Sequence, residues 1–161
     1  MTRLYRLSGN TLEPVSRGKL ANENMIEEWI AQQPDLLGLD ILIIGRQVVT
    51  EFGGRIDLLG IDADGNLVIV ELKRDRTPRE IIAQVLDYAS WVSDLTTRQV
   101  HQLALNYLKA PLGTAFRNRF GSVLPQTLNE THTMVIVASA FDVSSQRIVR
   151  YLSETHDIAI N

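Results

Sequence analysis

The feature that most constrains the fold is a short apolar segment that ends in charge. Residues 67–73 read Leu-Val-Ile-Val-Glu-Leu-Lys and directly follow an Asp64-Gly65-Asn66 turn signal. Such a run after a turn predicts a mostly buried strand of a hairpin. Residues two apart in a strand point to the same face, so Glu71 and Lys73 are expected side by side among buried neighbours. Charges in such a place are costly unless they are paired or bind a metal.

Helices and strands are expected on both sides of this hairpin. Asn22 is the predicted N-cap of a helix over 23–33 that Pro34 ends. A capping box at Thr77–Glu80, with Pro78 at the first helical position, predicts a helix that reaches Val92. Strands are expected at 41–44, 47–51, 55–62, 133–139 and 158–160, and further helices at 97–108, 112–120 and from Ser144 or Ser145 to 155. This order predicts one α/β domain over residues 1–161, with a mixed central β-sheet flanked by α-helices.

Composition excludes several classes of protein. Apolar residues make up 45% and charged residues 22% of the 161 residues, which is typical of a globular domain. The chain has no cysteine and therefore no disulfide or thiolate zinc site, as is typical of the cytoplasm, where we expect the protein. No run of about 18 apolar residues is present, so no membrane span is expected. Because the last residues form an apolar, strand-like segment, we expect the natural protein to continue beyond Asn161.

The net charge of −3 argues against a protein that coats nucleic acid by bulk electrostatics. The charge is uneven, however, because residues 95–129 contain no acid and four bases. Chance clustering on a solvated surface is the simpler explanation of that stretch. The bases of the stretch are Arg98, Lys109, Arg117 and Arg119.

Other polar residues are expected near the charged end of the hairpin. Asp57 lies early in the preceding strand, and Glu23 precedes two apolar helix residues by three and seven positions, on the side that faces the core. Gln84 and Tyr88 lie one helical turn apart, on the apolar face of their helix. Each has a purely structural alternative: Glu71 and Lys73 as a solvated pair, Glu23 as an acid favoured by the helix dipole, and Gln84 as a satisfied core amide.

Together these side chains predict a divalent-cation site. Carboxylate oxygens are the ligands that Mg²⁺ or Mn²⁺ prefer, and Mg²⁺ keeps several waters for substrate phosphates. The three histidines show no metal-ligand spacing and are expected on the surface or in the core: His101, His132 and His156.

The pattern resembles the PD-(D/E)xK nuclease superfamily, in which a carboxylate precedes an (Asp/Glu)-x-Lys strand of a hairpin. Here Asp57 precedes Glu71-Leu72-Lys73 by fourteen residues. Gln84-x-x-x-Tyr88 matches a RecB-like element, and Glu23 falls where the family has its helix glutamate. Segments over about residues 20–93 are similar to the catalytic domain of NucS/EndoMS-type endonucleases: Gly54–Leu59, Asp64–Arg74 and Gln84–Tyr88.

The resemblance implies a restriction-endonuclease-like core of αβββαβ type and Mg²⁺- or Mn²⁺-dependent hydrolysis of DNA in repair, restriction or defence. Asp57, Glu71, the Leu72 carbonyl and Glu23 would bind the metal. Lys73 would orient the attacking water, and Gln84 and Tyr88 would hold the water or a phosphate. Only about twenty residues precede the catalytic helix, whereas the mismatch endonucleases of this family carry an extra N-terminal domain, so mismatch specificity is not carried over.

DNA is the expected partner, and the expected phosphate contacts are arginines: Arg55, Arg74, Arg76, Arg79, Arg117 and Arg119. For each of them, a plain solvated surface position is the alternative. A nuclease-fold module that binds nucleic acid or protein without cutting is the second functional hypothesis, and a structural α/β domain is the third. A homodimer and a further domain are both compatible with the sequence.

Overall fold

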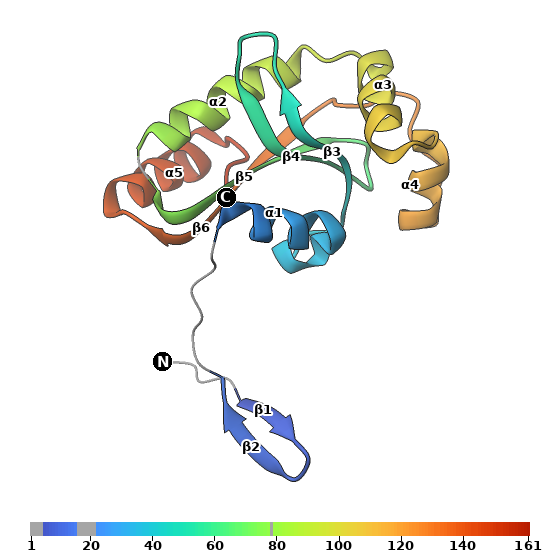
Figure 1. Ribbon diagram of the computed structural model, residues 1–161. Coiled ribbons are helices and arrows are strands. Elements are labelled where there is room, and N and C mark those ends of the chain that lie inside the picture. The colour runs from blue at the N-terminus through green and yellow to red at the C-terminus, as the bar shows by residue number, and fades with distance from the viewer. Residues whose placement is uncertain (1–4, 16–21, 78) are drawn as a thin grey trace.

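Four strands form the central sheet of the computed structural model, which describes residues 5–15, 22–77 and 79–161 and, for residues 75–77, the backbone alone. β3 (Ile41–Val49), β4 (Arg55–Asp62) and β5 (Leu67–Thr77) are antiparallel neighbours in that order. β6 (His132–Phe141) lies beside β5 and runs parallel to it. The mixed sheet that the sequence predicts is therefore confirmed (Figure 1).

Helices cover both faces of this sheet (Figure 1). On one face, α1 (Glu23–Gln32) and the short 3₁₀ helix η1 (Pro34–Leu37) pack on alternate residues of β3, β4 and β5. On the other face, four helices build the larger core: α2 (Glu80–Ser93), α3 (Thr97–Leu108), α4 (Leu112–Phe120) and α5 (Val143–His156). Because both faces are buried, the strands read as nearly continuous apolar runs, and any charge in them is conspicuous.

The start of α2 differs from the sequence prediction. β5 continues to Thr77, because its last residue pairs with Phe141 of β6. α2 begins at Glu80, and Arg79 at the N-cap position makes no capping hydrogen bond through its side chain. The predicted capping box at Thr77–Glu80 is therefore wrong, since pairing with β6 outweighs the local helix-start signal. Pro78 lies outside the described residues.

The other elements agree with the prediction, apart from their ends and from β3, which joins the two strands expected at 41–44 and 47–51. α5 begins one or two residues earlier than predicted, because Asp142 is its N-cap and accepts from the N–H groups of Ser144 and Ser145. Ile160 forms a parallel bridge with Met134, which confirms the strand-like end of the chain.

One hairpin near the N-terminus is absent from the sequence prediction. β1 (Tyr5–Ser8) and β2 (Thr11–Pro14) pair with each other, and every residue of both strands is exposed. Four-residue strands with no buried face leave no long apolar run for a sequence to show. In the part of the chain that the structure describes, no helix is long and apolar enough to cross a membrane.

Leu58 tests how far the α1 side of the sheet contributes to stability. Its side chain is fully buried next to Asp57, in the layer under α1. We expect Leu58→Ala to lower the free energy of unfolding in urea by about 2–5 kcal/mol, the usual cost of such a cavity. Leu36→Ala is the matched control, since Leu36 is 61% exposed, and an equal loss in both variants would contradict the packing described here.

Candidate active site

Two acidic side chains lie where β4 and β5 separate. Leu58 and Val70 are the last paired residues of these strands on this side, and Asp57 and Glu71 come directly beyond them. The Leu72 N–H donates to Asp57 Oδ2 at 2.8 Å, so the Asp57 carboxylate spans the gap between the strands. The sequence prediction that these two acids meet at the end of the hairpin is confirmed.

Two other polar side chains of the predicted set contact the Glu71 carboxylate, and a third contacts one of them. Its Oε1 accepts from Lys73 Nζ at 3.1 Å and from Gln84 Nε2 at 2.9 Å. Gln84 Nε2 also donates to Tyr88 Oη at 2.7 Å, and Tyr88 Oη accepts from the Arg55 N–H at 3.2 Å. Glu71 is only 1% exposed, so its ion pair with Lys73 is not a solvated surface pair, the purely structural explanation of these two residues.

Burial and crowding of negative charge set the acidity of these groups. Burial, together with the charge of Asp57, raises the pKa of Glu71 to about 7. Burial also raises the pKa of Asp57, against the opposing effect of the Leu72 N–H. Burial alone would lower the pKa of Lys73. The negative charges of Glu71 and Asp57 outweigh this effect, so the pKa is raised. Such paired, perturbed carboxylates are typical of functional sites.

Glu23 reaches the same end of β5 from the first turn of α1. Its Oε1 accepts from the Arg74 N–H at 2.8 Å. Its side chain is exposed, so the prediction that Glu23 faces the core is wrong. The acid of α1 that faces the core is Glu27, one turn further along the helix and only 3% exposed.

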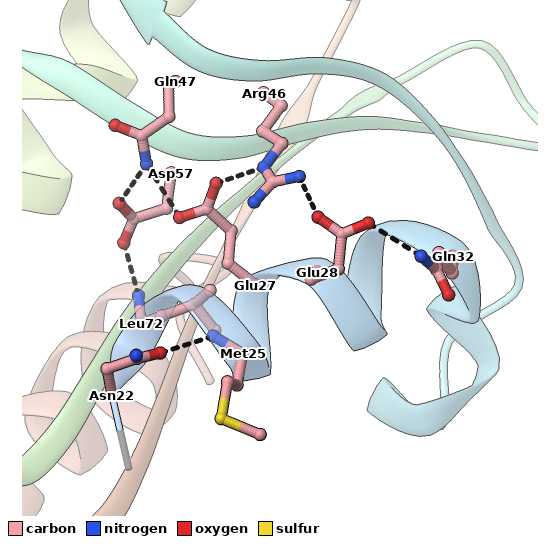
Figure 2. Close-up of polar contacts among 9 residues, drawn as sticks. All are labelled: Asn22, Met25, Glu27, Glu28, Gln32, Arg46, Gln47, Asp57 and Leu72. Atoms are coloured by element: carbon pink, nitrogen blue, oxygen red, sulfur yellow. Dashed lines mark hydrogen bonds and ion pairs between the residues drawn. The ribbon is translucent and has the colours of Figure 1, made fainter. Parts of the chain in front are cut away.

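Three residues of this site are absent from the sequence prediction, and Figure 2 shows them together. Glu27 accepts from Arg46 Nε and, at 2.8 Å, from Gln47 Nε2. Gln47 Nε2 also donates to Asp57 Oδ1 at 3.1 Å. For Glu27 a signal existed, because it follows the predicted Glu23 by one helical turn. The sequence contains no signal for Arg46 or Gln47, since their contacts with Glu27 join segments about twenty residues apart.

The chemistry of the donor set fits a hard divalent cation. Glu71 Oε2 is buried and has no hydrogen-bond partner among the described residues, so one oxygen is available next to Asp57. The carbonyl of Leu72 faces the same side as its N–H, toward Asp57, because both groups of a residue in an extended strand share a side. No cluster of three or more acids, histidines or cysteines around one point occurs among residues 5–15, 22–77 and 79–161. Two carboxylates and a carbonyl suit Mg²⁺, which retains several waters.

The predicted phosphate contacts fall into two groups. Arg55, Arg74 and Arg79 are exposed near the acids, at the start of β4, the end of β5 and the start of α2. The side chain of Arg76 lies outside the described residues. Arg117 and Arg119 lie on α4, which packs on α3 (Figure 1). Arg119 is already engaged, at 2.5 Å from Asp35 and 2.8 Å from Asp40.

Comparison with known proteins assigns the chain to a family. Residues 22–104, more than half of the chain, match the family described as the endonuclease NucS C-terminal domain. The chain belongs to this family. The matched range contains every residue of the site described above. A curated relative, the endonuclease NucS of Sulfolobus acidocaldarius, is 26% identical over 115 residues, which are 66% of this chain and 46% of the relative.

Two solved structures have a fold similar to that of this chain. A complex of EndoMS with double-stranded DNA has a TM-score of 0.53 at 19% identity over 92% of this chain and 48% of its own. A repair endonuclease from Pyrococcus abyssi has a TM-score of 0.52 at 16% identity over 93% and 54%, respectively. The chain thus spans about half the length of the relatives that it matches.

Gly54 is expected to be essential for the position of Tyr88. A Cβ at Gly54 would lie 2.5 Å from Tyr88 Cε1 and 3.1 Å from Thr50 Oγ1. We expect Gly54→Ala to lower the free energy of unfolding by about 1–3 kcal/mol, because the buried ring must move. The matched control is Gly113→Ala in α4, where a Cβ meets nothing within 4 Å and the helix gains stability. Urea unfolding of the two variants measures the difference, and two equal effects would contradict the close contact.

The Glu71 carboxyl is expected to make stability pH-dependent in EDTA. Between its ordinary pKa of 4.5 and about 7, the folded protein keeps this proton while the unfolded chain releases it. The contribution of Glu71 to stability therefore falls as the pH rises through this window and is constant outside it. We expect Glu71→Gln to gain up to about 3 kcal/mol relative to the native protein on going from pH 4.5 to pH 8. Urea unfolding across this range measures it, and parallel pH profiles of the two proteins would contradict the raised pKa.

Proposed function

We propose that this chain is the catalytic domain of a divalent-metal-dependent DNA endonuclease that acts in DNA repair. The observation that carries the proposal is the pair of enclosed carboxylates, Asp57 and Glu71, with Lys73 beside them and one oxygen of Glu71 that has no hydrogen-bond partner among the described residues. Membership in the NucS family supports it, and so do the EndoMS complex with double-stranded DNA and the repair endonuclease among the similar structures.

Asp57, Glu71 and the Leu72 carbonyl would hold Mg²⁺ or Mn²⁺, with Glu23 contacting it directly or through a water. The bound cation would supply a water of lowered pKa and neutralise charge that develops on the phosphate. Because a proton competes with the cation for Glu71, whose pKa is about 7, metal affinity is expected to fall below that pH.

The remaining residues have roles that follow from their contacts. Lys73, whose Nζ already contacts Glu71, would orient the attacking water and balance negative charge at the phosphate. Gln84 of α2 donates to both Glu71 and Tyr88, and Gln84 and Tyr88 would place the water or a phosphate oxygen. The exposed arginines around the site would contact DNA phosphates, which positions a duplex without reading its sequence.

Cleavage assays on the full chain test this proposal. We expect cutting of at least one of plain duplex, mismatched, branched or single-stranded DNA with Mg²⁺ or Mn²⁺, and none in EDTA. Asp57→Asn is expected to lower the rate about 10³-fold or more, because a metal ligand contributes several kcal/mol to the transition state. Asp87→Asn, which changes an exposed acid on the outer side of α2, is the matched control and should cut like the native protein.

Two results would contradict the proposal. Cutting that persists in EDTA or in Asp57→Asn would exclude the metal mechanism. DNA binding without cutting of any substrate would favour the alternative of a nuclease-fold binding module.

A further inference from the structure

Gln47 joins the two sides of the candidate site. It lies in β3 opposite Asp57 of β4, since its neighbours on either side pair with the neighbours of Asp57. Its amide nitrogen donates to Asp57 Oδ1 at 3.1 Å and to Glu27 Oε2 at 2.8 Å (Figure 2). An NH₂ group carries two hydrogens, one for each carboxylate. The opposite orientation would place the amide oxygen against two acids, so the surroundings determine how the amide lies.

Glu27, the second acceptor of the Gln47 amide, is held in place by a charged partner. Glu27 is 3% exposed, and Arg46 donates to it and to the neighbouring Glu28. The contact with Glu27, followed by that with Glu28, raises the pKa of Arg46, which stays charged. A buried carboxylate with a charged partner has little freedom to turn. Glu27 is therefore a fixed support for the amide of Gln47.

The backbone of β3 is shaped for this contact. Gln47 has a φ of +52°, a left-handed conformation that residues with a side chain seldom adopt. In a regular strand, consecutive side chains point to opposite faces. Here Arg46 and Gln47 are consecutive and both reach Glu27, so the alternation is broken where φ is positive. Uncommon backbone conformations of this kind persist where surrounding contacts determine them, and they cluster at functional sites.

We infer that Gln47 is a positioning residue, which orients the Asp57 carboxylate for binding of a divalent cation. The inference rests on the proposed metal-dependent function. Asp57 Oδ2 accepts from Leu72 in β5, and Oδ1 accepts from Gln47 in β3. With one donor on each oxygen, from the strands on either side, rotation of the carboxylate would break both hydrogen bonds. Each oxygen retains a lone pair that a cation can use.

Direct titration of the full chain with Mn²⁺, followed by electron paramagnetic resonance, tests this role without DNA. Gln47→Gly removes the amide and suits the positive φ, so we expect Mn²⁺ affinity to fall about tenfold or more while the melting temperature does not fall. Gln47→Asn also suits this backbone, but it is one methylene shorter and cannot span both acids, so it should lose affinity likewise.

Lys109→Gly is the matched control. Lys109 has a φ of +56° at the end of α3, so glycine relieves the same backbone conformation away from the site. This variant should bind Mn²⁺ with native affinity. A second measurement needs no metal: the side-chain NH₂ signals of Gln47 in EDTA should shift in ¹H–¹⁵N spectra on Asp57→Asn and on Glu27→Gln.

The outcomes separate this role from the proposed function. Native Mn²⁺ affinity in Gln47→Gly, or an equal loss in Lys109→Gly, would overturn the positioning role. The positioning role would also be overturned if the native protein bound Mn²⁺ no more tightly than Asp57→Asn does. A native protein that binds Mn²⁺ but cuts no DNA would contradict the nuclease proposal, whereas weakened Mn²⁺ binding by Gln47→Gly would still support the positioning role.

Discussion

Enclosure of the Glu71 carboxylate beside Asp57 is the interaction on which the rest of the site depends. Two acids at the end of a buried strand pair repel each other, and burial adds to the cost of their charge. Hydrogen bonds offset this cost. Glu71 accepts from the ammonium of Lys73 in β5 and from the amide of Gln84 in α2, and Asp57 accepts from a backbone N–H. Glu71 Oε2 accepts no hydrogen bond from the residues that the structure describes, and a cation would fill this place.

The same constraint explains how the surrounding elements are placed. Tyr88 receives hydrogen bonds from Gln84 and from the backbone at Arg55, so α2 is tied to the start of β4. Glu23 ties the first turn of α1 to the end of β5. Helices from both faces of the sheet thus contribute contacts to the site. The family match over residues 22–104 contains all of these contacts and none of α4, α5 or β6.

The sequence predicts the parts of the site that follow a local period. The turn at Asp64-Gly65-Asn66 places Glu71 opposite Asp57, and helical spacing places Gln84 beside Tyr88. The sequence does not predict the contacts of Gln47, because a positive φ at a residue other than glycine has no local signature. It also mispredicts the start of α2, where pairing between β5 and β6 decides the backbone.

One consequence of this arrangement concerns local stability. Glu71 and Lys73 lie where β5 has separated from β4 but still pairs with β6, so exposing their backbone requires β5 and β6 to separate. Glu23 lies in the exposed first turn of a ten-residue helix, which the Asn22 cap and the contact of Glu23 with the Arg74 N–H hold in place. Helix ends open at far lower free energy than sheet centres. The site therefore combines a floor of paired strands with a helix end that opens at lower free energy.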